Sequence, residues 1–289
     1  MNTRVFSDTA IDLHMHTTYS DGRWSAEELL NYLTREGFDL VAVTDHDRVD
    51  TVAGIQQMGA QQGIEVLAGV EISAQWRGQM ADVLCYGFDP QNEDLRALAG
   101  QVHARAATNA EEVYEELRHR GYDFPRRQEL LSATQDELRV AGDCANLLIK
   151  HGYVNDWPTA LEVIRDAGYR TMLADIAETV EAVHRSGGVA LIAHPGRGLR
   201  EPHEFTYYTS DLLNQVRAEI PLDGIEVYHP THSQEMIESY LVYAQQHNLL
   251  ISAGSDSHGP PGRLPIKHPA ALCQKLFERL NVWKSSSHS

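Results

Sequence analysis

The sequence predicts an α/β protein in which βα units surround a parallel sheet and a helical segment interrupts the series. Three observations lead to this fold class. Short apolar runs rich in β-branched residues alternate with amphipathic stretches, and the alternation stops between residues 92 and 170. The length of 289 residues fits two ordinary domains or one large α/β barrel with an insertion, because a domain has roughly 150 residues.

Seven apolar runs are predicted to form the strands. They cover residues 11–15, 40–44, 64–72, 82–86, 189–193, 224–228 and 249–253. The helix after the first run is predicted to begin after Ser25 and to end at Gly37, because Ser25 and Glu28 have capping-box spacing and glycine commonly ends a helix. Residues 175–185 and 233–247 are also predicted to be helices, each followed by an apolar run.

The interrupting segment, residues 92–170, is predicted to be an inserted helical subdomain. Leu95, Leu98 and Val102 recur at helical spacing, and the pattern continues at Val113 and Leu117. The body of the protein would then comprise residues 1–91 and 171–283. Residues 284–289 are polar, and we expect them to be a disordered tail.

The charge and hydropathy of the chain exclude several classes of function. Lysine and arginine number 24 against 41 acidic residues, which gives a formal charge of −17 and argues against a long nucleic-acid track. No apolar run approaches the roughly 20 residues of a membrane-spanning helix, and the N-terminus does not resemble a secretory signal. Three cysteines without a CxxC pair suit a reducing compartment. We therefore expect a cytoplasmic protein without a membrane partner.

Potential metal ligands stand at the carboxyl ends of the predicted strands, where α/β proteins form their ligand sites. His14 and His16 are two residues apart, so on an extended strand both rings face one side and can chelate one cation. Alone, this pair is more typical of two histidines on the solvent face of an edge strand than of a metal site. The same spacing recurs at Asp256 and His258, and the repetition favours a metal site.

Further candidate ligands follow other strands. Asp45 and His46 end the second run, although Asp45 could instead cap the next helix. Glu71 ends the third run, where a carboxylate is costly unless it is paired or bound to metal, and it could bridge two cations. His194 follows the fifth run and precedes a Pro-Gly turn that would aim its ring inward. Arg197 would then stand near the site as an anion donor.

Asp21 lies on the loop after His16 and is either a ligand or a simple turn residue. His229 and His232 have no partner at chelating spacing, and we expect them to contact substrate. Nitrogen and oxygen donors without thiolate suit Mn²⁺ first, with Zn²⁺, Fe²⁺ or Mg²⁺ as alternatives. Because the candidates exceed what one ion can bind, the sequence predicts two or three divalent metal ions, an arrangement that hydrolyses phosphate esters.

The order of these motifs resembles that of the PHP (polymerase and histidinol phosphatase) family. The matching segments are DLHMHTTYSDG, VTDHD, GVEIS, IAHPGR, GIEVYHPTHS and GSDSHG, which span residues 11–259. Within the family they are most similar to stand-alone metal-dependent phosphoesterases that act on nucleoside 3′,5′-bisphosphates and on the 5′ ends of short RNA or DNA. The resemblance implies a distorted (β/α)7 barrel with a helical insertion.

The resemblance also implies roles for single residues. One metal would take His14, His16, Glu71 and Asp256, a second would share Glu71 and take His194, and a third would take Asp21, His46 and His258. A hydroxide between two metals would attack phosphorus in line. Asp256 would orient or deprotonate that water, with His194 beside the reacting group, and Arg197 would hold a phosphate oxygen. Ser20 is expected to join Arg197, His229 and His232 in contacting substrate.

Two departures from the family pattern stand out. Family members commonly have a histidine where this chain has Asp82, in a motif of the form HxLGY. Asp82 would still be a ligand through oxygen and would favour harder cations. In the insertion, nucleotide-acting relatives carry an Arg-Pro-His run where this chain has Ala141, Gly142 and Asp143. A phosphorylated small molecule other than a nucleotide is therefore an alternative substrate.

The sequence thus predicts a metal-dependent phosphoesterase. Its substrate would be a small phosphorylated metabolite, and nucleoside 3′,5′-bisphosphates or short oligonucleotides are the first candidates. A sugar-phosphate or histidinol-phosphate-type phosphatase is the alternative enzyme. A metal-binding protein that has lost catalysis is the alternative of another class, suggested by Asp82 and Asp143.

Overall fold

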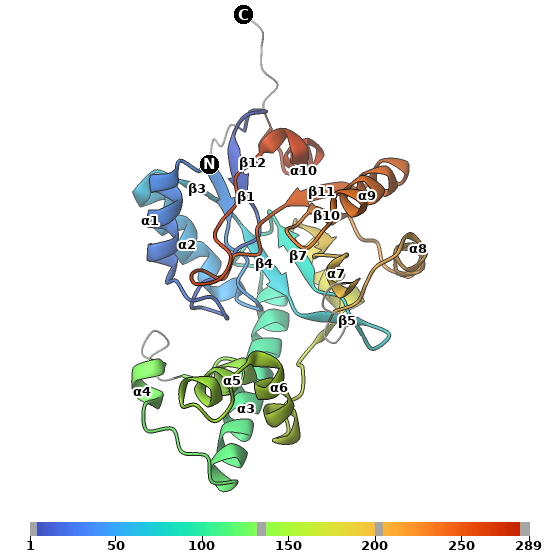
Figure 1. The fold of residues 1–289 in the computed structure, drawn as a ribbon. Coiled ribbons are helices and arrows are strands. Elements are labelled where there is room, and N and C mark those ends of the chain that lie inside the picture. The colour runs from blue at the N-terminus through green and yellow to red at the C-terminus, as the bar shows by residue number, and fades with distance from the viewer. Residues whose placement is uncertain (1–4, 132–136, 200–204, 284–289) are drawn as a thin grey trace, which may run out of the picture.

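The structure is a computed structural model that describes residues 5–131, 137–199 and 205–283. It has a mixed α/β fold, as the sequence predicts (Figure 1). The predicted tail, residues 284–289, lies outside the described residues. Within the described ranges, no helix combines the length and the apolar character needed to cross a lipid bilayer.

The strands form two larger sheets and one small sheet. Their orders are β12-β1-β2-β3, β11-β10-β9-β7-β4 and β6-β5-β8. The strands are β1 (Ala10–Asp12), β2 (Leu40–Ala42), β3 (Glu65–Leu67), β4 (Gly69–Ile72), β5 (Ala74–Trp76), β6 (Gln79–Met80), β7 (Val83–Tyr86), β8 (Ala174–Asp175), β9 (Val189–Ile192), β10 (Gly224–Tyr228), β11 (Leu250–Ala253) and β12 (His268–Pro269).

Two features of the predicted sheet are wrong. The run 64–72 is not one strand, because it divides at Ala68 into β3 and β4, which belong to different sheets. The sheet is also not all parallel, since β7 runs antiparallel to both β4 and β9. Parallel neighbours need a crossover of about a dozen residues or more. The short segment between β4 and β7 contains the antiparallel β5–β6 pairing instead, and it returns the chain in the opposite direction.

The two larger sheets meet at two places near the carboxyl ends of β1 and β2. On one side the Leu13 amide donates to the Ala253 carbonyl (3.1 Å), and Met15 forms a parallel bridge with Ser257. On the other side His46 forms a parallel bridge with Glu71. The described strands do not form one closed sheet, so the closed barrel stays a prediction.

Apolar side chains from both larger sheets form one core between them. This core contains Ile11 on β1, Leu40 on β2, Leu84 on β7, Leu191 on β9 and Ala253, which ends β11. All five are almost wholly buried. Burying their side chains supplies hydrophobic stabilisation that can offset the cost of the polar residues gathered at the carboxyl ends of the same strands.

Helices cover the outer faces of the sheets (Figure 1). These helices are α1 (Ala26–Glu36), α2 (Val49–Gln62), α7 (Ile176–Arg185), α8 (Ser210–Glu219) and α9 (Gln234–Gln246). α10 (Gln274–Arg279) instead contributes Leu276 and Phe277 to the core between the sheets. The predicted boundaries of α1 are confirmed. Ser25 and Glu28 form the capping box, and Gly37 ends the helix in the left-handed conformation.

The segment between β7 and β8 is helical and carries its own core. It contains α3 (Glu93–His119), α4 (Arg127–Leu130), α5 (Ala141–Lys150) and α6 (Trp157–Asp166). α3 extends from the sheets into the group formed by α4, α5 and α6 (Figure 1). Val113, Leu117, Leu148 and Ile164 belong to a buried cluster separate from the cores of the sheets. The division into subdomains at residues 92 and 170 stays a prediction.

Candidate metal centre

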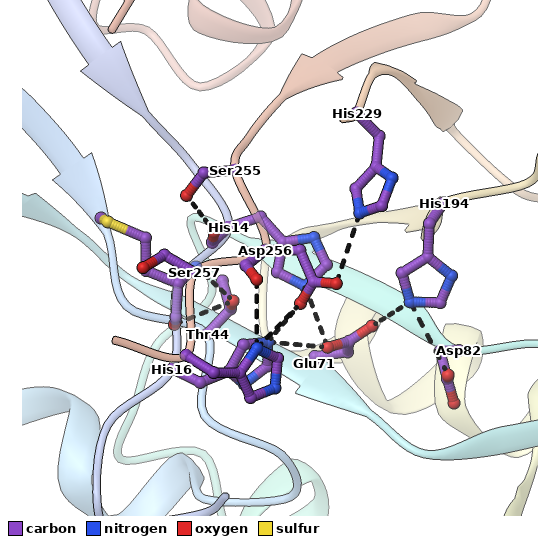
Figure 2. Close-up of polar contacts among 12 residues, drawn as sticks. His14, His16, Thr44, Glu71, Asp82, His194, His229, Ser255, Asp256 and Ser257 are labelled. Atoms are coloured by element: carbon purple, nitrogen blue, oxygen red, sulfur yellow. Dashed lines mark hydrogen bonds and ion pairs between the residues drawn. The ribbon is translucent and has the colours of Figure 1, made fainter. Parts of the chain in front are cut away.

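Histidines and carboxylates from distant parts of the chain meet at the carboxyl ends of the strands (Figure 2). His14 and His16 follow β1, Glu71 lies in β4, His194 follows β9 and Asp256 follows β11. All five side chains are buried, with at most 5% of their surface exposed. Such a concentration of buried polar groups is costly unless the groups compensate one another or bind a ligand.

The ligand atoms in the described part of the chain form three groups, in each of which all atoms lie within 4.8 Å of one another. The groups are His14, His16 and Asp256; Glu71, Asp82 and His194; and His16, Asp21, His46 and His258. The third group is the most open to solvent, since its Asp21 and His258 side chains are 36% and 30% exposed. Of the candidate ligands named from the sequence, all except Asp45 belong to one of these groups.

Glu71 lies between the groups. Its Oε2 atom is 3.0 Å from the Nε2 atom of His14, 3.2 Å from that of His16 and 3.4 Å from that of His46. Its Oε1 atom is 3.0 Å from the Nε2 atom of His194. The two carboxylate oxygens therefore face different sets of histidines, which is the arrangement that a carboxylate needs in order to bridge two cations.

His16 provides a test of whether the site fits a metal. Both ring nitrogens are buried, and neither makes a hydrogen bond in the described part of the chain. Its Nε2 atom lies 3.2 Å from Glu71 and 3.3 Å from Asp256, and its Nδ1 atom lies 3.6 Å from Asp21. A buried ring without hydrogen bonds, surrounded by carboxylate oxygens, has the donor chemistry of a divalent cation ligand. The residues fit a metal ion.

Asp256 presents its two oxygens to different surroundings. The Oδ1 atom faces the Nε2 atoms of His14 (3.6 Å) and His16 (3.3 Å). The Oδ2 atom accepts a hydrogen bond from Nη1 of Arg197 (3.3 Å), and Nη1 of Arg263 lies 3.6 Å from it. One side of this carboxylate thus faces candidate metal ligands, and the other faces two guanidinium groups that can bind an anion.

The site couples the ionisation of its acids and histidines. Burial alone would raise the pKa of Asp256, but His14, His16, His229 and His258 hold it well below its usual value. Burial would likewise lower the pKa of His14, but the carboxylates around it raise that pKa well above the usual value. The acids are thus compensated by protons on histidine, which a divalent cation would replace.

Unusual backbone conformations aim the ligands. Asp47, His194 and Asp256 have positive φ angles of 57°, 28° and 51°, a region that residues other than glycine rarely occupy. Gly254 permits the close approach of β1 and β11, because a Cβ atom there would collide with the backbone and Cβ of His14. Three of the six residues other than glycine with positive φ in the described part of the chain are therefore candidate ligands or, like Asp47, neighbours of one in the sequence.

The loop that carries Asp21 is held by Asp45. Oδ1 of Asp45 accepts hydrogen bonds from the Thr17 amide (2.7 Å) and from the Ser20 hydroxyl (2.7 Å). Asp45 therefore holds this loop, and it neither caps α2 nor belongs to the three groups. The Ser20 hydroxyl is buried and donates to Asp45, and the predicted contact of Ser20 with substrate stays a prediction.

Both ring nitrogens of His232 are engaged by the backbone. Its Nδ1 atom is 2.8 Å from the Val227 carbonyl, and its Nε2 atom accepts from the Gly196 amide (3.0 Å). His232 therefore supports the turn after His194, and its contact with substrate stays a prediction. The ring of His229 is nearer to the groups, since its Nε2 atom lies 3.4 Å from Oδ2 of Asp256.

Sequence reasoning missed Glu226 and Arg263. Glu226 is wholly buried, and it contacts the ring of His14 (2.9 Å) and the amide of His194 (2.7 Å). Burial opposes its ionisation, but His14, His229 and His194 lower its pKa to about 2. The signal was present, because Glu226 is a single acid inside an apolar strand, as Glu71 is. Arg263 lies in a polar loop, where nothing in the sequence distinguishes it.

The helical segment between β7 and β8 contacts the loop that carries Asp21 through Arg139. Nη2 of Arg139 lies 2.8 Å from Oδ1 of Asp143, whose side chain is 5% exposed. Nη1 of Arg139 donates to the Thr18 carbonyl (2.9 Å), on the loop that carries Asp21. Asp143 therefore holds an arginine against the loop at the edge of the site.

Comparisons with known proteins agree with this geometry. The family model for the PHP domain matches residues 12–183. A phosphoribosyl 1,2-cyclic phosphate 1,2-diphosphodiesterase of Eggerthella lenta is 29% identical over 88% of this chain and 96% of its own length. A 5′-3′ exoribonuclease of Haemophilus influenzae is 29% identical over 94% and 97% of the two chains.

Two further similarities extend over most of the chain. A 3′,5′-nucleoside bisphosphate phosphatase of Chromobacterium violaceum is 28% identical over 94% of this chain and 96% of its own length. A solved structure from Bifidobacterium adolescentis, described as that of a metal-dependent phosphoesterase, superposes with a TM-score of 0.77 at 25% identity. The superposition covers 93% of the present chain and 96% of the Bifidobacterium chain.

Proposed function

Because the chain belongs to the PHP family of metal-dependent phosphoesterases, we propose that it hydrolyses small phosphate esters at a centre of two or three divalent cations. The observation that carries this proposal is His16, a buried histidine without hydrogen bonds among three carboxylates. Bound cations would lower the pKa of water and neutralise charge on the phosphoryl oxygens. We further propose that the two larger sheets act as one distorted barrel that holds this centre.

The proposed ligands follow the three groups. One cation would be held by His14, His16, Glu71 and Asp256, and a second by Glu71, Asp82 and His194. Asp21, His46 and His258 would hold a third cation at the more exposed end. The donors are nitrogen and oxygen only, and the three cysteines are buried elsewhere as free thiols. This donor set supports Mn²⁺ over a thiolate-bound zinc, and free thiols support a reducing, cytoplasmic compartment.

The remaining polar groups of the site would bind and orient the substrate. Arg197 and Arg263 approach one oxygen of Asp256 and can each donate to a phosphate oxygen. His229 contacts the same oxygen and can hold or move a proton there. Asp256 would orient the attacking water, because its other oxygen faces the candidate ligands.

The proposed substrate class is a phosphate ester on a ribose. The names of the three relatives share this chemistry, since one acts on a phosphoribosyl cyclic phosphate, one on RNA and one on nucleoside bisphosphates. Within this class we propose nucleoside 3′,5′-bisphosphates and short oligonucleotides as the first candidate substrates. Sugar phosphates are the alternative substrates, and Asp143 at the edge of the site favours them. The net charge of −17 supports a small substrate over a long nucleic acid.

The test is phosphate release from a panel of esters with Mn²⁺, Mg²⁺ and Zn²⁺ compared. The panel contains nucleoside 3′,5′-bisphosphates, ribose cyclic phosphates, dinucleotides and sugar phosphates. We expect metal-dependent release from ribose esters that is lost in His46→Ala and Asp256→Asn. Release that is unchanged in both variants would contradict the proposed centre. A protein that binds metal but hydrolyses no ester would support a metal-binding protein that has lost catalysis.

A further inference from the structure

Glu226 connects two of the three ligand groups without belonging to either. It lies in the middle of β10 and is wholly buried. Its Oε1 atom is 2.9 Å from the Nδ1 atom of His14, and its Oε2 atom accepts a hydrogen bond from the backbone amide of His194 (2.7 Å). His14 and His194 in turn contact opposite oxygens of Glu71 through their Nε2 atoms, each at 3.0 Å.

The contact with His14 selects one form of the ring. A neutral histidine carries its hydrogen on one nitrogen and offers a lone pair on the other. A carboxylate oxygen beside Nδ1 favours the hydrogen on Nδ1, because a lone pair there would face the negative charge of Glu226. Nε2 faces the carboxylates of Glu71 and Asp256, and it would be free of hydrogen once a cation between them takes the place of the proton. This is the form in which His14 can be a metal ligand.

The contact with His194 acts on the backbone. His194 has a φ angle of 28°, which costs conformational energy unless its surroundings hold it. The hydrogen bond from its amide to Glu226 supplies such support, and Gly196 and Pro195 complete the turn. The ring of His194 is thereby held toward Glu71 and Asp82.

We propose that Glu226 is a positioning residue that fixes the ligand form of His14 and the backbone of His194, and so sets metal affinity in two groups at once. The proposal rests on the proposed metal centre. A role in packing alone does not explain the residue, because an apolar side chain would fill a strand interior between Ile225 and Val227 without the cost of burying a charge.

Asp223 provides a matched control just before the same strand. Its Oδ2 atom lies 2.7 Å from the Nε2 atom of His184 and accepts from the Ala190 amide (2.8 Å). Like Glu226, it holds one histidine ring and one backbone amide near β9. It lies outside the three ligand groups. Asp223→Asn therefore removes the same kind of interaction without touching the candidate centre.

The first test compares Mn²⁺ binding by calorimetry in the full-length, metal-stripped wild type, Glu226→Gln and Asp223→Asn. If the introduced glutamine turns its amide nitrogen toward His14, it donates to Nδ1 and moves the ring hydrogen to Nε2, so that Nε2 cannot bind metal. If the nitrogen turns toward the His194 amide, two donors face each other. We expect Glu226→Gln to bind Mn²⁺ about 10–100-fold more weakly, while Asp223→Asn binds as the wild type does. Equal affinity in Glu226→Gln and wild type, or equal weakening in both variants, would overturn the inference.

The second test needs no variant and so remains valid if Glu226→Gln does not fold. In zinc-loaded wild type, the ring ¹⁵N resonances of His14 are expected to show the hydrogen on Nδ1. A hydrogen on Nε2 would overturn the inference. Failure of the proposed function gives a different result, because the wild type would then bind neither Mn²⁺ nor Zn²⁺ at the centre.

Discussion

The Oδ2 atom of Asp82 lies 3.9 Å from the Nε2 atom of His194, too far for a hydrogen bond and close enough for both atoms to bind one cation. Glu71 completes this group with an oxygen 3.0 Å from the same nitrogen. Burial and the nearby charge of Glu71 raise the pKa of Asp82. Two buried carboxylates in contact with one histidine form a site in which a divalent cation would compensate the negative charge.

Replacing Asp82 by histidine is expected to change metal preference. A nitrogen donor in place of an oxygen donor favours Zn²⁺ over Mn²⁺ or Mg²⁺. We expect the ratio of Zn²⁺ to Mn²⁺ affinity to rise about tenfold, which is about 1.4 kcal/mol. Competition between the two ions, measured by calorimetry, checks this. Asp82→Asn is the control and should weaken the binding of both ions. Unchanged stoichiometry and preference in Asp82→His would show that residue 82 is not a ligand.

Removing the guanidinium of Arg263 is expected to weaken catalysis without weakening metal binding. Hydrogen bonds to charged groups contribute about 1.5–3 kcal/mol, so kcat/KM in Arg263→Met should fall about 10–100-fold. Arg77→Met is the control, because Arg77 is exposed and pairs with Glu219. Steady-state kinetics on a nucleoside 3′,5′-bisphosphate measure the effect. A wild-type kcat/KM in Arg263→Met would exclude this residue from substrate binding.

The ion pair of the insertion is expected to contribute to stability. Arg139→Met leaves the buried Asp143 without this partner and should lower the free energy of unfolding by about 3–5 kcal/mol. The double variant Arg139→Met/Asp143→Leu buries no charge and should recover part of this loss. Urea unfolding measures both. The single variant Asp143→Leu completes the comparison. If the double variant loses as much free energy of unfolding as the two single variants lose together, the residues do not act as a pair.

Acid is expected to destabilise the protein partly through His232. Burial lowers the pKa of His232 to about 4, and its Nε2 atom accepts from Gly196. Between pH 6.5 and 4 the unfolded chain therefore binds a proton that the folded protein does not, so the free energy of unfolding falls as pH falls. The contribution is about 3 kcal/mol across this range.

Denaturant unfolding at several pH values tests this contribution. His232→Asn keeps a donor for the Val227 carbonyl but cannot titrate, so its stability should depend less on pH between 6.5 and 4. A pH dependence identical to that of the wild type would show that another group is responsible.

The sequence predicted which polar residues meet at the strand ends better than it predicted the sheet. His14, His16, Glu71 and Asp256 could be selected because polar residues that end apolar strands need a physical reason. Hydrophobic periodicity carries no information about strand direction, so the antiparallel course of β7 was not predictable from it. The division at Ala68 was not predicted either. β3 and β4 are both largely buried, so in the sequence they form one continuous apolar run.

Glu226 and Arg263 were not predicted from the sequence, for different reasons. Glu226 contacts His14 and the His194 amide, and its spacing to them in the sequence reveals no contact. Arg263 reaches Asp256 from a loop after β11, where loop conformation decides the direction of the side chain. In the sequence Asp143 suggests a loss of function, and only the structure shows that it holds Arg139 against the Thr18 loop.

The most direct test of the proposed centre is a titration of Mn²⁺ into metal-stripped protein while phosphate release from a nucleoside 3′,5′-bisphosphate is measured. We expect no release without metal, recovery as Mn²⁺ is added, and a plateau at two or three ions per chain. Glu71→Gln should fail to recover, because it removes the carboxylate that contacts all of the candidate ligand groups. Full release from the metal-stripped protein would contradict a metal-dependent centre.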